Sequence, residues 1–112
     1  SFTTMSAQVT ITPDASSSKI LVIFNAGKAK QYPCVRLHRD GSQISKGGQG
    51  PATQNYHDMT QIFYDSPGGT SAYNYRMYWR QCAGSNSVSY VKVSGGNNSG
   101  STMNMVAIEI LA

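Results

Sequence analysis

The chain has 112 residues, of which 39% are hydrophobic and only 12% charged, and its formal net charge is +4. This length suits a single hydrophobic core, so we expect residues 1–112 to form one domain. Because the charged fraction is about half of the roughly 25% usual in globular proteins, the polar surface must come from Ser, Thr, Asn, Gln, Gly and Tyr. That composition favours an extracellular or particle surface over a cytosolic enzyme.

The basic residues are scattered, with no run longer than the spaced pair Lys28 and Lys30. A nucleic-acid partner is therefore not expected, since such proteins cluster their basic residues into a patch. No apolar run approaches the roughly 20 residues of a membrane span, so membrane insertion is not expected either. The chain begins at Ser1 rather than Met, and we expect a processed product or the terminal piece of a longer protein.

Two strands are predicted near the start of the chain. Residues 5–12 alternate apolar and polar side chains, as in a half-buried strand, and Pro13 and Asp14 end that strand. Residues 19–26 form the second strand, and its centre, ILVIF at 20–24, is apolar on both faces. A strand of this kind needs cover on both sides, from a second sheet and from a loop or another subunit.

A hairpin follows in the middle of the chain. Residues 34–39 and 42–45 are predicted strands joined by Asp40 and Gly41, which tolerate the positive φ values of a tight turn. The stretch 46–55, rich in glycine, is predicted to be a loop.

The second half of the chain alternates strands and turns. We expect strands at 59–65, 73–81 and 87–93, with a turn at 84–86 and a loop at 94–101. In the strand 73–81, Tyr73, Tyr75, Met77 and Trp79 share one face, and Asn74, Arg76, Tyr78 and Arg80 share the other. Trp79 is expected in the core because of the neighbours on its face.

The final strand, 102–111, is again apolar on both faces, and its one charge, Glu109, needs a partner if it is buried. Seven or eight short strands with turns between them predict an all-β fold, an antiparallel sandwich of jelly-roll type with almost no helix. The two doubly apolar strands, 19–26 and 102–111, favour a subunit interface, although loops of the same chain are the alternative cover.

The two cysteines, Cys34 and Cys82, lie far apart in sequence in predicted strands. We expect both to be buried thiols that pack as small apolar side chains, and a disulfide between them is the alternative. Two cysteines do not complete a zinc site, and neither His38 nor His57 stands at a recognisable ligand spacing. We predict no metal site and no cofactor.

Four segments carry a family resemblance: SSSKILVIF (16–24), RLHRDGSQI (36–44), YDSPGGTSAYNYRM (64–77) and AIEIL (107–111). In this order they resemble the C-terminal domains of bacteriophage tail-fibre and related fibre proteins, especially those of marine and cyanobacterial phages. The resemblance covers about residues 6–111. The loops 46–55 and 95–101 follow no family pattern, so recognition residues cannot be transferred from the family.

The resemblance implies a β-sandwich fibre tip on the surface of the virion that assembles as a homotrimer with other virion proteins. It also implies adsorption to a host receptor, for which a surface glycan is the expected ligand. The alternative is a structural protein that decorates the head or caps a fibre and has no ligand of its own. A cellular lectin-like module is a third possibility.

Candidate binding residues combine amides, aromatic rings and imidazole in the loops, as sugar-binding sites do. They are Gln54, Asn55, Tyr56, His57, Asn97 and Asn98. In the competing interpretation, each tyrosine lies on a solvent-exposed strand face, where tyrosine is common, and the asparagines form turns. Catalysis is not expected, because His57 beside Asp58 is the only suggestive pair and no nucleophile, phosphate-loop or metalloprotease motif accompanies it.

Overall fold

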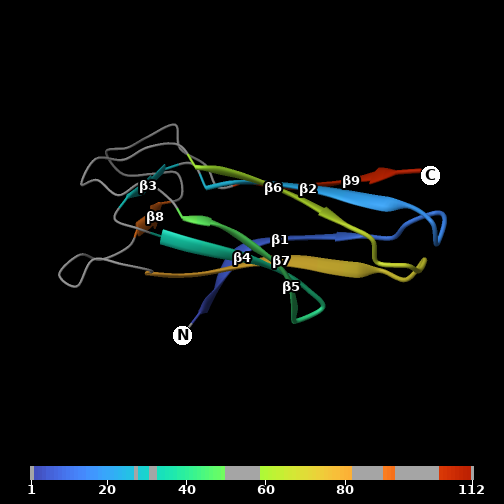
Figure 1. The fold of residues 1–112 in the computed structure, drawn as a ribbon, viewed down its shortest axis with the longest axis horizontal. Helices are drawn as coiled ribbons and strands as arrows, with labels where there is room; N and C mark the ends of the chain where they lie inside the picture. The colour runs from blue at the N-terminus through green and yellow to red at the C-terminus, as the bar shows by residue number, and fades with distance from the viewer. Residues whose placement is uncertain are drawn as a thin grey trace.

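The computed structural model describes residues 2–26, 28–30, 33–49, 59–81, 90–92 and 104–111, and these form two stacked antiparallel sheets (Figure 1). The larger sheet has the order β1 (Thr3–Ile11), β7 (Tyr73–Gln81), β4 (Pro33–Arg39) and β5 (Ser42–Gln49). The smaller sheet has the order β6 (Thr60–Asp65), β2 (Lys19–Asn25) and β9 (Asn104–Ile110). Short strands β3 (Lys28–Lys30) and β8 (Tyr90–Lys92) form a separate ribbon.

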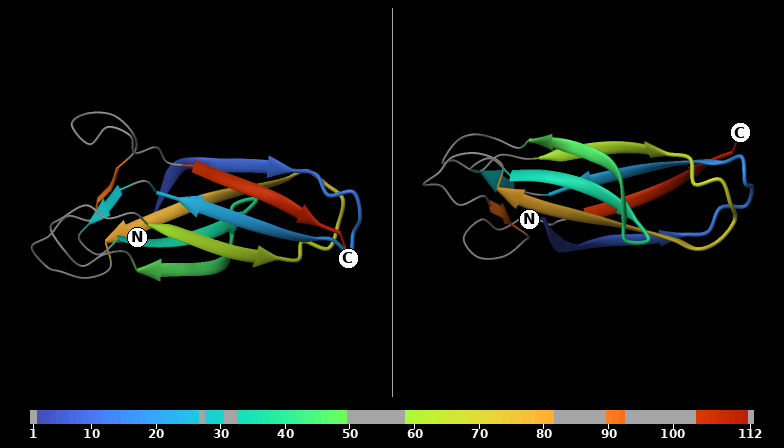
Figure 2. Two further views of the ribbon diagram at one scale, coloured as in Figure 1. Left: turned by 90° about the horizontal axis from the view of Figure 1, so that it is seen from above. Right: turned by 60° about the horizontal axis from the view of Figure 1, so that its bottom comes forward.

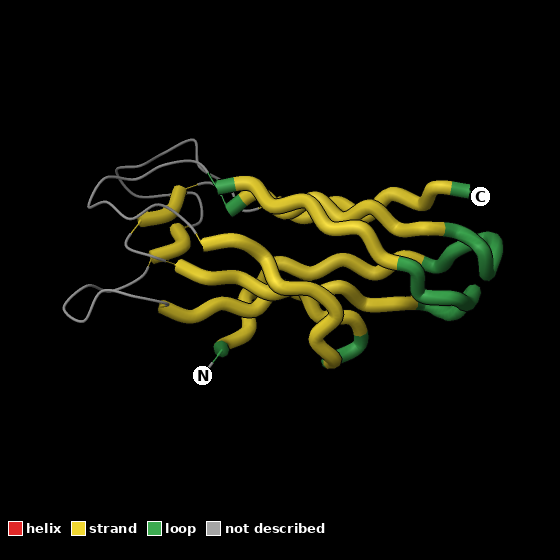
Figure 3. The backbone as a smooth tube through the Cα atoms, viewed as in Figure 1, coloured by secondary structure: helices red, strands yellow, loops and turns green. Residues whose placement is uncertain are grey.

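The predicted all-β antiparallel sandwich is confirmed. Every strand pair is antiparallel, and none of the described residues is helical (Figure 3). The smaller sheet lies across the larger one, and β1 approaches β9 while β5 approaches β6 where the sheets meet at their sides (Figure 2). The two sheets thereby enclose a single core.

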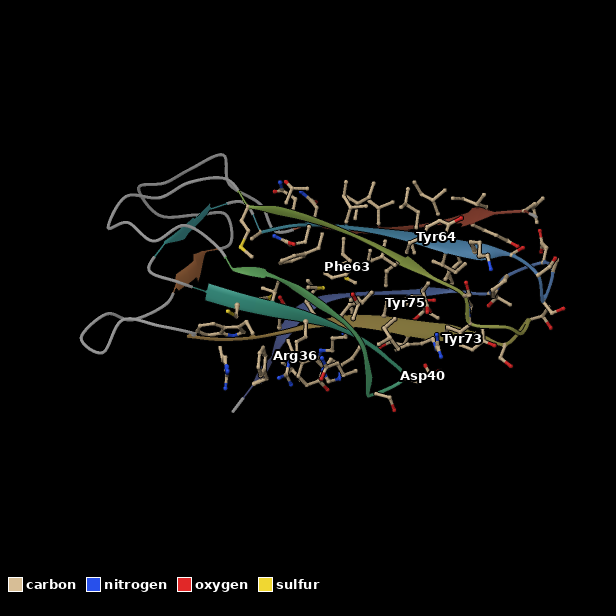
Figure 4. The ribbon with its side chains drawn as sticks, in the orientation of Figure 1. Arg36, Asp40, Phe63, Tyr64, Tyr73 and Tyr75 are labelled. Carbon is tan, nitrogen blue, oxygen red and sulfur yellow. The ribbon has the colours of Figure 1, made fainter. Side chains whose placement is uncertain are left out.

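The core consists of the side chains that the two sheets direct toward each other. Alternation along β2 buries Ile20, Val22 and Phe24 completely, and Phe63 and Tyr75 enter the same space from opposite sheets (Figure 4). Each fully buried side chain of this size contributes about 1.5–3 kcal/mol relative to exposure. The remaining core members are Met5, Ala26, Val35, Leu37, Met59 and Met77.

The predicted strands agree with the structure, except that several begin or end at different residues and one strand was not predicted. The short strand β3 was not expected, and β5 continues through Gln49 into the segment predicted as a loop. The prediction for 46–49 is wrong because the ladder with β4 continues past two irregularities in register, until Gln49 lies opposite Cys34. Of the predicted strand 87–93 only β8 is described, and the expected turn 84–86 and loop 94–101 lie outside the described residues.

The predicted hairpin between β4 and β5 is confirmed. Asp40 and Gly41 have φ values of 50° and 88°, as a primed two-residue turn requires. Asp40 also joins the turn to β7: its N–H donates to the Asn74 carbonyl at 2.8 Å, and its Oδ1 accepts the Asn74 N–H at 2.9 Å. The turn is therefore fixed to the neighbouring strand as well as to its own.

Charged side chains hold the two sheets together at one end of the sandwich. Arg39 on β4 donates from Nη1 to Oδ2 of Asp65 on β6 at 2.5 Å, and this hydrogen bond raises the pKa of Arg39. Glu109 is not buried, so the condition of the prediction is not met, but its Oε2 accepts the Asp14 N–H at 2.8 Å and the Ser18 hydroxyl at 2.7 Å, both from the segment between β1 and β2. Both contacts join elements far apart in sequence.

The expectation of two free thiols is wrong for Cys34, which is disulfide-bonded. Cys82, the other cysteine of the chain, lies outside the described residues. The strand pairing supplies the physical reason. Cys34 on β4 lies opposite Arg80 near the end of β7, so the fold brings the chain just before residue 82 close to Cys34.

Candidate functional site

All six predicted binding residues, Gln54, Asn55, Tyr56, His57, Asn97 and Asn98, lie outside the described residues. Their role therefore stays a prediction. The described residues instead present two outer faces of contrasting chemistry, one on each sheet, and Tyr64 and Arg36 mark them on opposite sides of the sandwich (Figure 4).

The outer face of the smaller sheet carries a central apolar surface, which we call the apolar face, with Lys19 at one end and Asn25, Thr60 and Asn104 at the other. Its residues come from all three strands: Leu21, Ile23, Ile62, Tyr64, Val106, Ile108 and Ile110. Tyr64, Leu21 and Ile108 form one row across the sheet, and Ile23 connects Ile62 with Val106 in the next row. The face is therefore a continuous apolar surface.

This apolar face is open to solvent in the single chain. Ile62 and Tyr64 are 66% and 61% exposed, and Val106, Ile108 and Ile110 are 48%, 43% and 38% exposed. Strands 19–26 and 102–111 were predicted to be apolar on both faces, and the described parts of both strands confirm this. One face of each strand packs into the core, and no described residue covers the other face.

The outer face of the larger sheet is basic and aromatic, and we call it the basic face. It comprises Phe2 and five outward side chains of β4 and β7, namely Arg36, His38, Arg76, Tyr78 and Arg80, and Cys34 and Asn74 lie on the same side of these strands. Tyr78 lies opposite Arg36, and His38 lies opposite Arg76. Two strands that are not neighbours in sequence therefore supply one cluster.

Aromatic rings position the cations of this basic face. The guanidinium carbon of Arg36 lies 3.6 Å from the ring centroid of Phe2, and that of Arg80 lies 4.9 Å from the same centroid. Arg76 is fixed by a 2.7 Å hydrogen bond from its Nε to the Met5 carbonyl. These contacts hold three guanidinium groups in place on the surface before any ligand binds.

His38 is stacked on Tyr78 within the basic face. The ring centroids are 3.7 Å apart and the planes differ by 18°. Nδ1 lies 3.2 Å from the Gly41 carbonyl oxygen, and because a carbonyl only accepts, Nδ1 is the donor. His38 Nε2 is buried and has no hydrogen-bond partner among the described residues.

Amide and hydroxyl groups continue the basic face along β1 and β7. Asn74 donates from Nδ2 to Gln8 Oε1 at 3.3 Å and to Thr10 Oγ1 at 3.1 Å. Gln8 lies opposite Arg76 in the strand register. A ligand on the arginines would therefore meet neutral hydrogen-bonding groups beside them.

The sequence contained part of the signal for the basic face. Alternation in 73–81 places Arg76, Tyr78 and Arg80 on one side of a strand, as predicted, and alternation in 34–39 does the same for Arg36 and His38. The missing information was that β4 and β7 are neighbours. Without that pairing, the basic residues were interpreted as scattered.

Within the described residues, no group of three or more His, Cys, Asp or Glu side chains could hold a metal ion. The same part of the chain contains no helix with the length and hydropathy needed to cross a bilayer. Comparison with known proteins finds no matching family model, no matching curated protein and no matching solved structure.

Proposed function

We propose that the chain is a non-enzymatic virion fibre domain that assembles as a homotrimer and attaches the particle to a glycan on the host surface. The observation that carries the proposal is the exposed apolar face of the β6-β2-β9 sheet. The four segments that resemble phage fibre tips supply the functional class.

The size of the apolar face supports its burial against other copies of the chain. Its exposed side chains present on the order of 500 Å² of apolar surface, near the upper limit for the largest patch of a soluble monomer. Burying that area would contribute about 12 kcal/mol per subunit, which offsets most or all of the cost of association. Burial of the apolar face therefore favours assembly.

The width of the sheet supports a threefold arrangement. Three strands span about 14 Å, and three sheets of this width closed into a triangular prism would lie about 4 Å from the common axis. Two packed sheets lie about 10 Å apart, so side chains fill about 5 Å from each sheet plane. A trimer would therefore fill its interior with the apolar faces and leave no large cavity.

Trimeric assembly also explains how such a domain could adhere strongly. Three equivalent sites on one tip, repeated over several fibres, increase the effective affinity without a tight individual site. The basic face lies on the opposite side of the sandwich from the apolar face (Figure 4), so it would remain accessible in the assembly.

The mass of the isolated chain in solution tests the assembly. Sedimentation velocity at micromolar concentration should give three times the mass of one chain. Ile62→Lys, which places a charge at the most exposed isoleucine of the apolar face, should give a folded monomer. Gln43→Lys, an exposed residue on the larger sheet, is the control and should remain trimeric. A monomeric or dimeric wild-type chain would contradict the proposal.

Adsorption tests the attachment function. Excess isolated domain should block adsorption of the parent virus to its host cells. Unaltered adsorption would favour the alternative, a structural protein that decorates the head or caps a fibre.

A further inference from the structure

We propose that the basic face binds an acidic polysaccharide, whose sulfate or carboxylate groups are held by Arg36, Arg76 and Arg80. This assignment rests on the proposed function and names the ligand class and the site. It differs from the loop residues predicted from sequence, because the ligand would lie on the outer surface of the β1-β7-β4-β5 sheet.

No carboxylate in the described part of the chain compensates the charge of the basic face. Among the described residues, the one ion pair is that of Arg39 with Asp65, between the sheets, and Glu109 binds Ser18 on a different part of the fold. The Asp40 carboxylate accepts a hydrogen bond from the Asn74 backbone N–H. No described carboxylate contacts the three arginines of the basic face, so an anion from outside would supply the missing charge.

The geometry of the arginines suits anionic oxygens. A guanidinium that lies over an aromatic ring still has N–H donors for a carboxylate or sulfate group, because the ring accepts none of them as a conventional hydrogen bond. Arg36 and Arg80 both lie over the Phe2 ring, and Arg76 uses one of its five donors on the Met5 carbonyl. Less side-chain entropy is lost on binding because the groups are already positioned.

The arrangement of the cations suits an extended polymer. Arg76 and Arg80 lie two positions to either side of Tyr78 on β7, and Arg36 lies opposite Tyr78 on β4. Neighbouring outward positions on a strand are about 7 Å apart. A polyanion lying along β7 would therefore meet a cation at each end of this segment and a third beside its centre, with Gln8 and Asn74 close to Arg76.

The rings of the basic face argue against single-stranded nucleic acid. Proteins of that kind offer free aromatic faces on which bases stack. Here Phe2 already packs against two guanidinium groups, and one face of Tyr78 is covered by His38. Because these ring faces are already in contact with other side chains, a neutral sugar held by ring stacking alone is also disfavoured. Charge and hydrogen bonds therefore remain as the main sources of affinity.

Binding of defined polysaccharides to the isolated chain tests the proposal. Dextran sulfate supplies sulfate groups, alginate supplies carboxylates, unsubstituted dextran is the neutral control, and a DNA duplex represents another class of polyanion. We expect binding to dextran sulfate, alginate or both, weakening as salt is raised, and none to dextran. The double variant Arg36→Gln with Arg80→Gln should bind at least about a hundredfold more weakly, at about tenfold per charged contact.

Two further variants distinguish binding at the positioned arginines from nonspecific attraction to the positive charge of the chain. Lys28→Gln with Lys92→Gln removes the same charge from the β3-β8 ribbon and should leave binding within about twofold of wild type. Phe2→Ala leaves the net charge unchanged but frees both guanidinium groups, and it should weaken binding several-fold. Circular dichroism establishes that each variant is folded.

The proposal is overturned if neither acidic polysaccharide binds, if the DNA duplex binds as tightly as they do, or if the two double variants lose binding equally. The adsorption experiment distinguishes a wrong ligand site from a wrong attachment function. If the domain blocks adsorption equally well with and without the Arg36 and Arg80 substitutions, the attachment function is retained and the receptor site lies elsewhere.

Discussion

The hydroxyl of Tyr75 on β7 donates a 2.6 Å hydrogen bond to Oδ2 of Asp65 on β6, which joins the two sheets from inside the core. The same carboxylate oxygen accepts the Arg39 guanidinium. Tyr75 is completely buried, and this burial, followed by the hydrogen bond to Asp65, raises the pKa of its phenol above the usual value. One carboxylate thus accepts hydrogen bonds from the buried Tyr75 hydroxyl and from the partly exposed Arg39 guanidinium.

Tyr75→Phe should lower the free energy of unfolding by about 1.5–3 kcal/mol. The substitution keeps the buried ring but removes a hydrogen bond to a charged acceptor, for which this range is usual. Urea denaturation followed by circular dichroism measures the change. Tyr64→Phe, which removes a hydroxyl from a side chain that is 61% exposed in the single chain, is the control. Both substitutions are measured in the monomeric variant Ile62→Lys, where Tyr64→Phe should change the stability by less than about 0.5 kcal/mol.

The same tyrosine should make the stability depend on alkaline pH. Because the pKa of Tyr75 is raised in the folded state, an unfolded chain releases this proton first, so the contribution of Tyr75 to stability is constant below about pH 10 and is lost as pH rises above it. The expected loss from this group is about 1.4 kcal/mol per pH unit. Tyr75→Phe should lack this component, and identical slopes for the variant and the wild type between pH 10 and 12 would contradict the assignment.

Glu109 should make the stability depend on acidic pH in the opposite sense. The hydrogen bond from Ser18 lowers the pKa of this carboxylate, with backbone donors at Asp14 and Ala15 assisting. The contribution is therefore present above the unfolded pKa, near 4.3, and is lost as pH falls through the folded value. Glu109→Gln should be less stable than wild type at pH 7 and approach it at pH 3.

Ser18→Ala provides the matched test of that contact. It removes the first donor to Glu109 and should reduce the acid dependence without changing the charge. If Ser18→Ala and Glu109→Gln act on one interaction, the double variant should lose less than the two single losses added together. Fully additive losses would contradict the coupling.

The sequence predicted the strands and their faces well because alternation is a local property. Asn74 and Tyr78 were assigned correctly to the side of β7 opposite Tyr75. Apart from the hairpin of β4 and β5, the sequence did not predict which strands are neighbours, so the approach of Arg36 to Tyr78, and of Cys34 to the end of β7, had no local signal. Strand pairing depends on the packing of the whole chain, and sites built across pairs are therefore found only from the structure.

Gly41→Ala should destabilise the fold by about 1 kcal/mol or slightly more. Gly41 has a φ of 88° in the hairpin between β4 and β5, and a side chain with a Cβ atom is strained there even though no atom of the fold occupies the space. Thermal denaturation measures the change. Ser42→Ala, at the first position of β5, is the neighbouring control and should be nearly neutral.

Cys34→Ala should lower the free energy of unfolding by about 2–4 kcal/mol, because the disulfide at Cys34 restricts the unfolded chain. Treatment of the wild type with dithiothreitol should lower its melting temperature toward that of the variant. The variant itself should not respond to the reductant. A response of equal size in both proteins would show that the reductant acts elsewhere.

The monomeric variant Ile62→Lys links the two proposals, since it changes the apolar face and leaves the basic face intact. Its affinity for a short sulfated oligosaccharide, which occupies one site, should equal that of the wild type. On a surface densely coated with dextran sulfate, however, the trimer engages several sites at once, so the variant should bind about a hundredfold more weakly. Biolayer interferometry at high and low coating density measures both quantities, and the difference should shrink as the coating is diluted. Equal weakening for the short oligosaccharide and the dense surface would mean that the substitution damages the site itself, and the avidity mechanism would have to be abandoned.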